Sequence, residues 1–277
     1  MERKLQLFPV VLGFLLCLAG CKNDLLLIGD SYVAWPTSGM KTYVQQMLPD
    51  KVIGVNAYPG RLAGCALNEQ GPNCHPLLAQ PLATWLQNSD VSAAKIAFIT
   101  LGGNEVLTHC NPTLGCPPQG MAEWDALVRE IVGYLVDIGN AVRNAGPQPV
   151  FVAYADWPEY QYGDVTPEMQ ALRNALVDDY FRLLQKENDA HGLGFQFIDL
   201  DGVLQGKRCC HQDMVHPTLH PLQMGPADCW PSGYNKNDYN AGHEIIAVEL
   251  CDHYTAETGE SGACGVTRPH DCTELYQ

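Results

Sequence analysis

Five short, continuous apolar runs recur along this chain, and they constrain its fold more than any other feature. They are "DLLLIG" (24–29), "KVIGVN" (51–56), "KIAFITLGG" (95–103), "PVFVAYA" (149–155) and "GFQFIDL" (194–200). Apolar residues that are continuous rather than alternating are typical of strands buried on both faces of a parallel sheet. The chain has 277 residues, 46% of them hydrophobic, which is enough for one large domain with a substantial core.

Helical patterns separate the later runs. Apolar residues recur at helical spacing over 121–142, and Gly146 ends that segment. A second helix is predicted to begin at Thr166, an N-cap followed by Pro167 at the first helical position, and to end at Gly192. Strands that alternate with helices predict a doubly wound α/β domain with right-handed crossovers and a five-stranded parallel sheet.

The first residues have the layout of a secretory signal. "MERKLQLFPVVLGFLLCLAGC" begins with basic residues, continues with an apolar run too short for a membrane span, and ends with small residues. Leu18-Ala19-Gly20-Cys21 resembles a bacterial lipobox, in which Cys21 becomes the lipidated first residue. We therefore expect a signal peptide at 1–20, a single domain at 21–277, and membrane contact only through the lipid on Cys21. Cleavage after Ala19, with free secretion, is the alternative.

The chain is acidic. Its formal net charge is −15, and the removal of residues 1–20, which carry one negative and two positive side chains, changes this to −16. Binding to nucleic-acid phosphates needs clustered Lys and Arg, and the sequence contains no such run. A nucleic-acid partner is therefore not expected.

Cysteine usage predicts disulfides. Of twelve cysteines, ten remain once Cys17 leaves with the signal and Cys21 carries the lipid. An even number in an exported chain indicates a disulfide set. Close spacing predicts two local bridges, Cys65–Cys74 and Cys110–Cys116. The other six cysteines fall in the last third of the chain, where the sequence leaves their pairing open: Cys209, Cys210, Cys229, Cys251, Cys264 and Cys272.

Polar clusters follow the first three predicted strands, at 29–32, 56–60 and 102–105. Sites in open α/β sheets form outside the carboxyl ends of the strands, so these three clusters are expected to meet at one edge of the sheet.

Three motifs occur in order: "LLLIGDSY", "LGGNE" and "DMVHP". Together they resemble the SGNH (GDSL-type) hydrolase family. The resemblance spans about residues 24–250, although its specific motifs occupy only some fifteen positions. It implies a serine hydrolase on a three-layer α/β/α, flavodoxin-like fold with a central five-stranded parallel sheet.

The resemblance also implies roles for single residues. Ser31 would be the nucleophile, His216 the general base, and Asp213 the carboxylate that orients the imidazole. The backbone N–H groups of Ser31 and Gly60, with the side-chain amide of Asn104, would form the oxyanion hole. Gly64 is a nearby alternative to Gly60.

These roles agree with elementary chemistry. A serine hydroxyl is a poor nucleophile until a base takes its proton, and histidine titrates near neutrality. A carboxylate on the far ring nitrogen fixes the tautomer of the imidazole. Such a site needs no cofactor. The expected activity is that of an esterase or lipase acting on a small-molecule, lipid or glycan ester, in a monomeric protein.

Two other interpretations compete with this one. Cys209, Cys210, His211, His216 and His220 could form a zinc site, but their spacing matches no standard pattern, and adjacent cysteines are awkward ligands for one tetrahedral ion. We therefore predict no metal, and expect disulfides to tie Cys209 and Cys210 to the C-terminal segment. A lipoprotein that binds glycans or a partner without catalysis is the second alternative.

The chain also departs from the family pattern at two places. Residues 218–241 form an insertion after the His-Pro pair, and Glu105 replaces the usual aspartate of the third block. The insertion weakens any inference of substrate by analogy.

Overall fold

The computed structural model describes residues 23–34, 39–67, 74, 81–89, 91–154, 164–200, 204, 210, 241–265 and 272. Several predicted features lie outside these residues: the signal peptide, Cys21, Cys209, Asp213, His216 and residues 218–240 of the insertion.

The described residues form a five-stranded parallel sheet, as predicted. The strands are β1 (Leu25–Gly29), β2 (Ile53–Ala57), β3 (Ile96–Thr100), β4 (Val150–Tyr154) and β5 (Phe195–Asp199). They pair in the order β2-β1-β3-β4-β5, and every pairing is parallel. This is the flavodoxin-like order, whose direction of winding reverses between β1 and β3. Ligand sites of such folds lie at that reversal.

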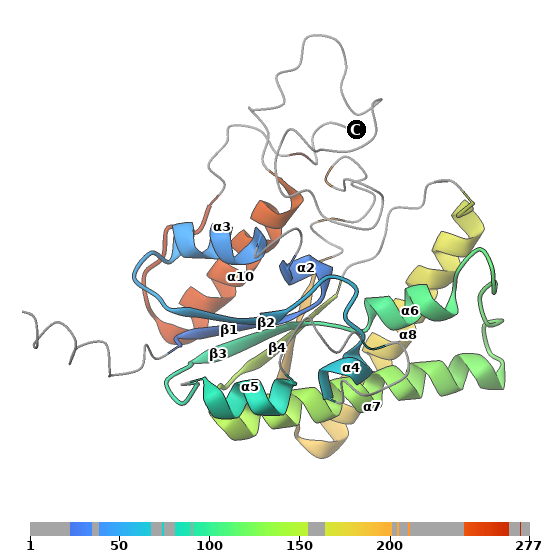
Figure 1. The fold of residues 1–277 in the computed structure, drawn as a ribbon, viewed down its shortest axis with the longest axis horizontal. Helices are drawn as coiled ribbons and strands as arrows, with labels where there is room; N and C mark the ends of the chain where they lie inside the picture. The colour runs from blue at the N-terminus through green and yellow to red at the C-terminus, as the bar shows by residue number, and fades with distance from the viewer. Residues whose placement is uncertain are drawn as a thin grey trace, which may run out of the picture.

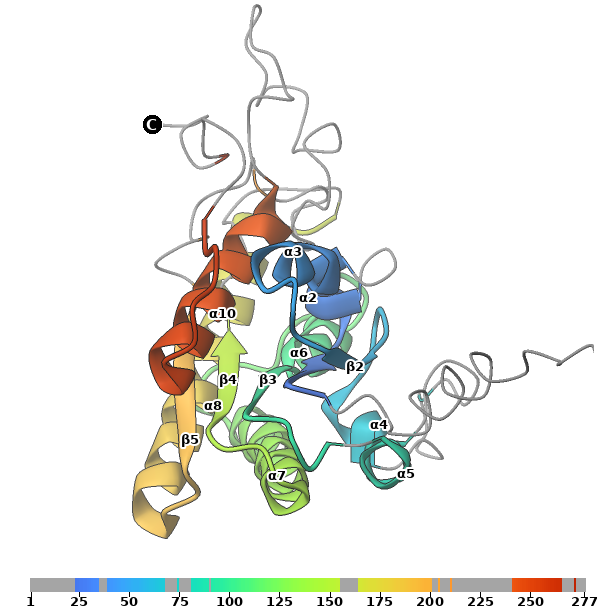
Figure 2. The same ribbon diagram turned by 90° about the vertical axis from the view of Figure 1, so that its left-hand side faces the viewer.

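Helices cover both faces of the sheet, which confirms the predicted three layers (Figure 1). Helices α3 (Gly39–Met47) and α10 (Gly242–Thr258) lie on one face and contact each other. The other face carries α4 (Ala63–Leu67), α5 (Leu82–Asn88), α7 (Ala122–Ala145) and α8 (Pro167–His191), as the view turned by 90° also shows (Figure 2). Two short helices, α2 (Ser31–Ala34) and α6 (Gly103–His109), begin where β1 and β3 end.

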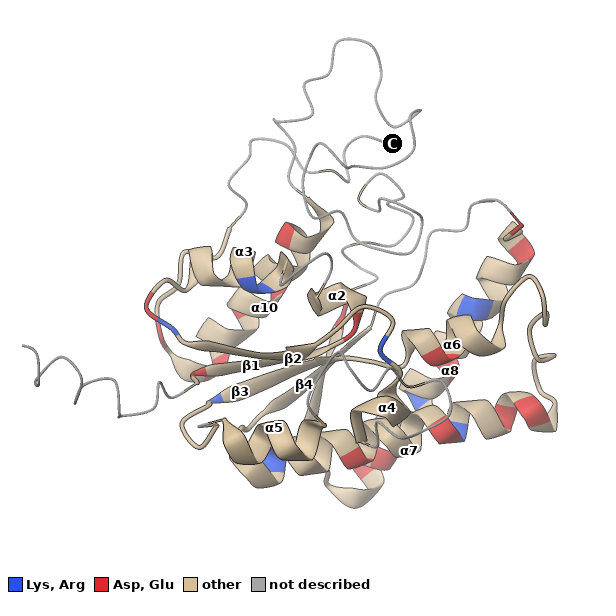
Figure 3. Ribbon diagram, viewed as in Figure 1, with Lys and Arg blue, Asp and Glu red and all other residues tan. Residues whose placement is uncertain are grey.

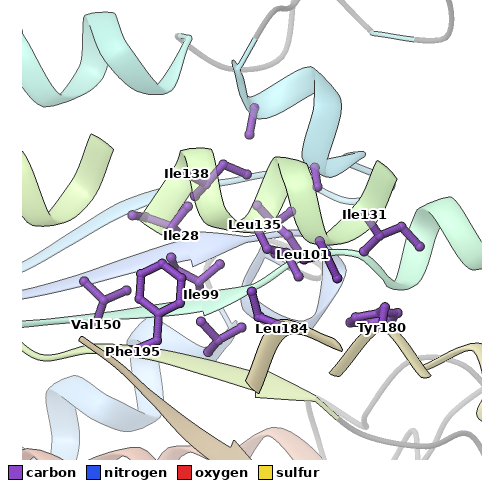
Figure 4. Close-up of a cluster of buried hydrophobic side chains, with 14 of the residues drawn as sticks. Ile28, Ile99, Leu101, Ile131, Leu135, Ile138, Val150, Tyr180, Leu184 and Phe195 are labelled. Atoms are coloured by element: carbon purple, nitrogen blue, oxygen red, sulfur yellow. The ribbon is translucent and has the colours of Figure 1, made fainter. Parts of the chain in front are cut away.

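Strand β1 is apolar along its whole length because its successive residues pack into one or the other of two cores. Leu26 and Ile28 belong to the core beneath α7 and α8, whereas Leu25 and Leu27 belong to the core beneath α3 and α10. All four side chains have no exposed surface. Figure 4 shows the first core, where a row of residues on α7 points toward the strands: Ile131, Leu135 and Ile138.

The boundaries of α8 match the local signals in the sequence. Thr166 Oγ1 accepts a hydrogen bond of 3.2 Å from the backbone N–H of Met169, and Pro167 is the first helical residue. Gly192 ends the helix in the left-handed conformation, with φ of 60°. On its buried face Leu184 is fully buried, whereas Leu183 is only partly buried.

Four disulfides join described cysteines. Cys65–Cys74 and Cys110–Cys116 confirm the two predicted local bridges. Cys210–Cys272 connects the segment after β5 to the C-terminal segment, as expected for Cys210, and Cys251–Cys264 connects α10 to the residues that follow it.

Acidic residues are spread over α7, α8 and α10 (Figure 3).

One of the acidic side chains, Glu260, is held by three donors at the amino end of the sheet: Lys51 Nζ at 2.6 Å, Lys95 Nζ, and Tyr254 Oη at 2.8 Å. These hydrogen bonds lower the pKa of Glu260 to about 2. The cluster joins the segments before β2 and β3 to the end of α10.

Within the described ranges, no helix combines the length and the apolar character needed to cross a bilayer.

Candidate active site

Asp30 links the end of β1 to the helix that begins with Ser31. Its Oδ1 accepts a hydrogen bond of 3.0 Å from the backbone N–H of Tyr32, and its carbonyl accepts from Val33 and Ala34 at 3.2 and 2.9 Å. This is the bonding of an N-cap aspartate, which satisfies the first N–H groups of a helix. Ser31 is therefore held in a defined turn at the carboxyl end of β1, and it is 4% exposed.

The side-chain amide of Asn104 connects three segments that are far apart in the sequence. Its Nδ2 donates to Asp30 Oδ2 at 3.2 Å and to the backbone carbonyl of Arg61 at 3.1 Å. Asn104 lies in the first turn of α6, just after Gly102, whose φ of 109° is unfavourable for other residues. The structure thus brings together the three polar clusters that the sequence placed at the ends of β1, β2 and β3.

Arg61 orders the turn that carries Gly60. The guanidinium is completely buried; its Nη1 donates to the carbonyl of Asn56 at 2.9 Å and also to Asn56 Oδ1. It also lies over the ring of Tyr58, 5.2 Å from the centroid. Gly60 has φ of 74°, which favours glycine. The sequence analysis missed Arg61, because a single arginine in a turn is usually exposed.

Glu105 contacts the segment that follows the Gly60–Arg61 turn, at Gly64. The side chain is 5% exposed, and its Oε1 accepts a hydrogen bond of 3.2 Å from the backbone N–H of Gly64. Burial raises the pKa of Glu105 to about 7, although neighbouring backbone N–H groups oppose the shift. The N–H of Gly64, the alternative oxyanion donor of the prediction, is thus already donated to this carboxyl group.

A small cavity lies beside this site at the carboxyl edge of the sheet. It has a volume of about 30 Å³, room for about two water molecules. The Oγ1 of Thr100, at the end of β3, is buried and has no hydrogen-bond partner within the described part of the chain. The lining comes from α2, β3, β4, α6, α8 and the residues next to them: Asp30, Tyr32, Thr100, Leu101, Gly103, Ala153, Tyr154, Val177, Tyr180 and Leu200.

The predicted base and carboxylate, His216 and Asp213, lie outside the described residues. The nearest described residue before them is Cys210, which is buried and bonded to Cys272. A disulfide removes Cys210 from the alternative zinc site, because a metal ligand must be a free thiolate. Within the described residues, no group of three or more His, Cys, Asp or Glu could hold a metal ion.

A scan against protein-family models and a search of curated proteins found no significant match. Among solved structures, this chain is similar to Axe2, an acetylxylan esterase from Geobacillus stearothermophilus. The TM-score is 0.51 and the identity 17%, over 87% of this chain and 96% of the esterase.

A gut microbial diltiazem-metabolizing enzyme is similar with a TM-score of 0.51 and 12% identity, over 84% of this chain. The match covers 47% of that enzyme, so this chain spans about half of its length. At such identities the likeness establishes the fold alone. The described part of this chain therefore has a three-layer α/β/α fold with a five-stranded parallel sheet, and this fold is similar to that of Axe2.

Proposed function

We propose that this chain hydrolyses carboxylic esters through an acyl-enzyme intermediate on Ser31. The observation that carries the proposal is the position of Asn104, whose amide lies between Asp30, next to Ser31, and Arg61, next to Gly60. The nucleophile and the two other predicted oxyanion donors therefore belong to one connected cluster. The cluster lies at the reversal point of the sheet, where ligand sites of this fold class form.

In this mechanism His216 takes the proton of Ser31 Oγ as the oxygen attacks the ester carbonyl. The tetrahedral intermediate collapses, the alcohol leaves with the proton from His216, and the acyl group stays on Ser31. A water molecule then attacks the acyl-enzyme, giving its proton to His216, and the carboxylic acid leaves as Ser31 regains its proton. Asp213 keeps the imidazole in the required tautomer throughout.

The backbone N–H groups of Ser31 and Gly60 and the amide of Asn104 would stabilise the oxyanion. In the structure Asn104 Nδ2 donates to Asp30 and to the Arg61 carbonyl. We propose that the developing oxyanion attracts the N–H group that donates to the Arg61 carbonyl, because a charged acceptor forms a stronger hydrogen bond than a neutral carbonyl. The remaining bond would keep the amide in place during the reaction.

We assign the cavity beside Asp30 and Tyr32 to the acyl group of the substrate. Both neighbours of Ser31 in the chain line this cavity, and its volume of about 30 Å³ suits an acetyl or similarly short acyl group. The relation in fold to an acetylxylan esterase points in the same direction. A series of p-nitrophenyl esters tests the assignment: kcat/KM should fall once the acyl chain exceeds about two or three carbons. A preference for long chains would contradict it.

A fluorophosphonate probe followed by peptide mapping tests the proposed nucleophile. The folded protein should be labelled at Ser31, Ser31→Ala should not be labelled, and Ser92→Ala, which changes an exposed serine before β3, should be labelled like the wild type. Labelling at another residue would overturn the assignment. Absence of labelling in folded protein would favour the non-catalytic binding lipoprotein instead.

We also propose that the protein is exported and carries a lipid on Cys21. The four disulfides support export, since such bonds persist in oxidising compartments. Mass spectrometry of the mature N-terminus from the native host tests this, and an unmodified start at Gly20 would indicate free secretion instead.

A further inference from the structure

The buried carboxyl group of Glu105 has no role in the reaction described above, yet it lies between two parts of the proposed oxyanion hole. Glu105 follows Asn104 directly in α6, and its Oε1 accepts the N–H of Gly64 in α4, 41 residues earlier in the chain. Gly64 follows the Gly60–Arg61 turn closely. One side chain thus connects the segment that supplies Asn104 to the segment that supplies Gly60.

The surroundings of Glu105 make this carboxyl group costly to ionise. The side chain is 5% exposed, and its Oε2 has no hydrogen-bond partner within the described residues. Asp30, at the end of β1, opposes its charge, whereas the backbone N–H groups of Ala63, Gly64 and Glu105 itself favour it. From α7, Tyr134 interacts with Glu105 electrostatically, and a Cβ on Gly64 would lie 3.0 Å from its ring.

The side chains of Tyr134 and Arg61, on neighbouring segments, donate hydrogen bonds to residues other than Glu105. The Tyr134 hydroxyl donates to Glu130 at 2.8 Å, and the guanidinium of Arg61 donates to Asn56. The environment described for Glu105 is therefore one of backbone N–H groups rather than of a cationic side chain. A buried carboxyl group that is compensated only by backbone N–H groups is still expensive to ionise, and functional sites are where such groups concentrate.

We propose that Glu105 is a positioning residue of the oxyanion hole, and that its ionised carboxylate holds the Gly60–Gly64 segment against α6 in the geometry that catalysis requires. This proposal rests on the proposed function. A carboxylate accepts a hydrogen bond from a backbone N–H more strongly than a neutral carboxyl group does. The Gly64 bond should therefore be strongest when Glu105 is ionised, and the loop should be best ordered at higher pH.

The same ionisation should lower the stability of the fold. The pKa of Glu105 is about 7 in the folded protein and has a reference value of 4.5. A carboxyl group whose pKa is raised by folding contributes stability below the unfolded pKa, and that contribution is lost as the pH rises through the folded pKa. Activity and stability should therefore change in opposite directions between about pH 5 and pH 8.

Glu105→Gln tests the proposal, because glutamine has nearly the same shape and never ionises. The ratio of wild-type to variant kcat should be close to one at pH 5.5 and should rise about 10- to 100-fold by pH 8.5, with KM nearly unchanged, as for a slightly misplaced catalytic group. The ionisation of His216 cancels in this ratio, because both proteins share it. A ratio that is the same at all pH values would overturn the proposal.

Two further variants control this experiment. Glu123→Gln makes the same change in the first turn of α7, where the side chain is exposed, and should give a ratio near one at every pH. Glu105→Asp keeps a carboxyl group, so its kcat should still rise with pH relative to Glu105→Gln. Equal pH profiles for the aspartate and glutamine variants would contradict the role of the charge.

Urea unfolding separates positioning from simple structural support. The stability of Glu105→Gln relative to the wild type should increase from pH 5.5 to pH 8.5, while its relative activity decreases. If Glu105 only stabilised the fold, activity and stability would fall together, and that result would overturn the proposal.

Hydrogen exchange makes the test independent of ester hydrolysis. After correction for the intrinsic effect of pH, peptides covering 58–67 should be more protected in the wild type than in Glu105→Gln at pH 8.5, and equally protected at pH 5.5. Such protection in a protein that cleaves no ester would show that the proposed function had failed while the loop contact held. Equal protection at both pH values would refute the loop contact itself.

Discussion

The side chain of Asn104 donates a hydrogen bond of 3.2 Å to Asp30 Oδ2, although 74 residues separate the two in the sequence. Asp30 also caps the helix that begins with Ser31, through the N–H of Tyr32. One carboxylate therefore joins the first turn of the helix that begins with the predicted nucleophile, through Oδ1, to the predicted amide donor, through Oδ2. A substitution at Asn104 should therefore alter the geometry around Ser31, and a substitution at Ser31 should alter the geometry around Asn104.

Asn104→Ala should lower kcat about 10²- to 10³-fold with little change in KM, because an oxyanion donor acts chiefly in the transition state. Steady-state kinetics on p-nitrophenyl acetate measures this. Asn144→Ala, on the exposed side of α7, is the matched control and should retain the parent activity. A rise in KM with unchanged kcat would place Asn104 in ground-state binding instead.

Asp213→Asn should lower kcat about 10⁴-fold through the wrong imidazole tautomer, and His216→Ala should remove nearly all hydrolysis. His211→Ala and His220→Ala should stay within a few-fold of the parent. Treatment with EDTA should change nothing, since the proposed chemistry uses no metal. Loss of activity in EDTA, or equal losses from His220→Ala and His216→Ala, would revive the zinc interpretation.

Arg61→Lys should destabilise the fold by about 1–3 kcal/mol, because a lysine ammonium lacks the reach and the planar geometry with which the guanidinium donates to Asn56. Urea unfolding measures the change. Because Arg61 also orders the turn at Gly60, kcat should fall as well. Arg129→Lys on α7 offers a control, and an Arg61 variant as stable and active as this control would show that the buried guanidinium is dispensable.

The Glu260 cluster should make the fold less stable at acidic pH. Hydrogen bonds from Lys51, Lys95 and Tyr254 lower the pKa of Glu260 to about 2, from a reference value of 4.5. A carboxyl group whose pKa is lowered by folding contributes stability above its unfolded pKa, and the contribution is lost as the pH falls through the folded pKa. Urea midpoints of the wild type should therefore decrease from about pH 5 toward pH 2.

Glu260→Gln should weaken that decrease, while Glu123→Gln should leave it as it is in the wild type. Parallel pH profiles for the wild type and Glu260→Gln would show that the cluster adds nothing to stability.

Much of the fold could be predicted from the sequence, because its signals are local. Each continuous apolar run contains one strand, except that β2 extends one residue beyond the end of its run. Thr166, Pro167 and Gly192 determine the ends of α8 through bonds and dihedral angles within a few residues. Close spacing likewise identified Cys65–Cys74 and Cys110–Cys116. The carboxyl-end rule for parallel strands predicts from the sequence that Ser31 and Asn104 lie at one edge of the sheet.

Only the tertiary structure decided how the residues at that edge contact one another. The burial of Arg61, the bond from Gly64 to Glu105 and the pairing of Cys210 with Cys272 join segments 5 to 62 residues apart. Neither hydrophobic period nor motif spacing determines such contacts, because they depend on how loops from different strands pack together. The sequence by itself determined which residues reach the edge of the sheet, whereas packing in three dimensions determined which hydrogen bonds they form and which charges become buried.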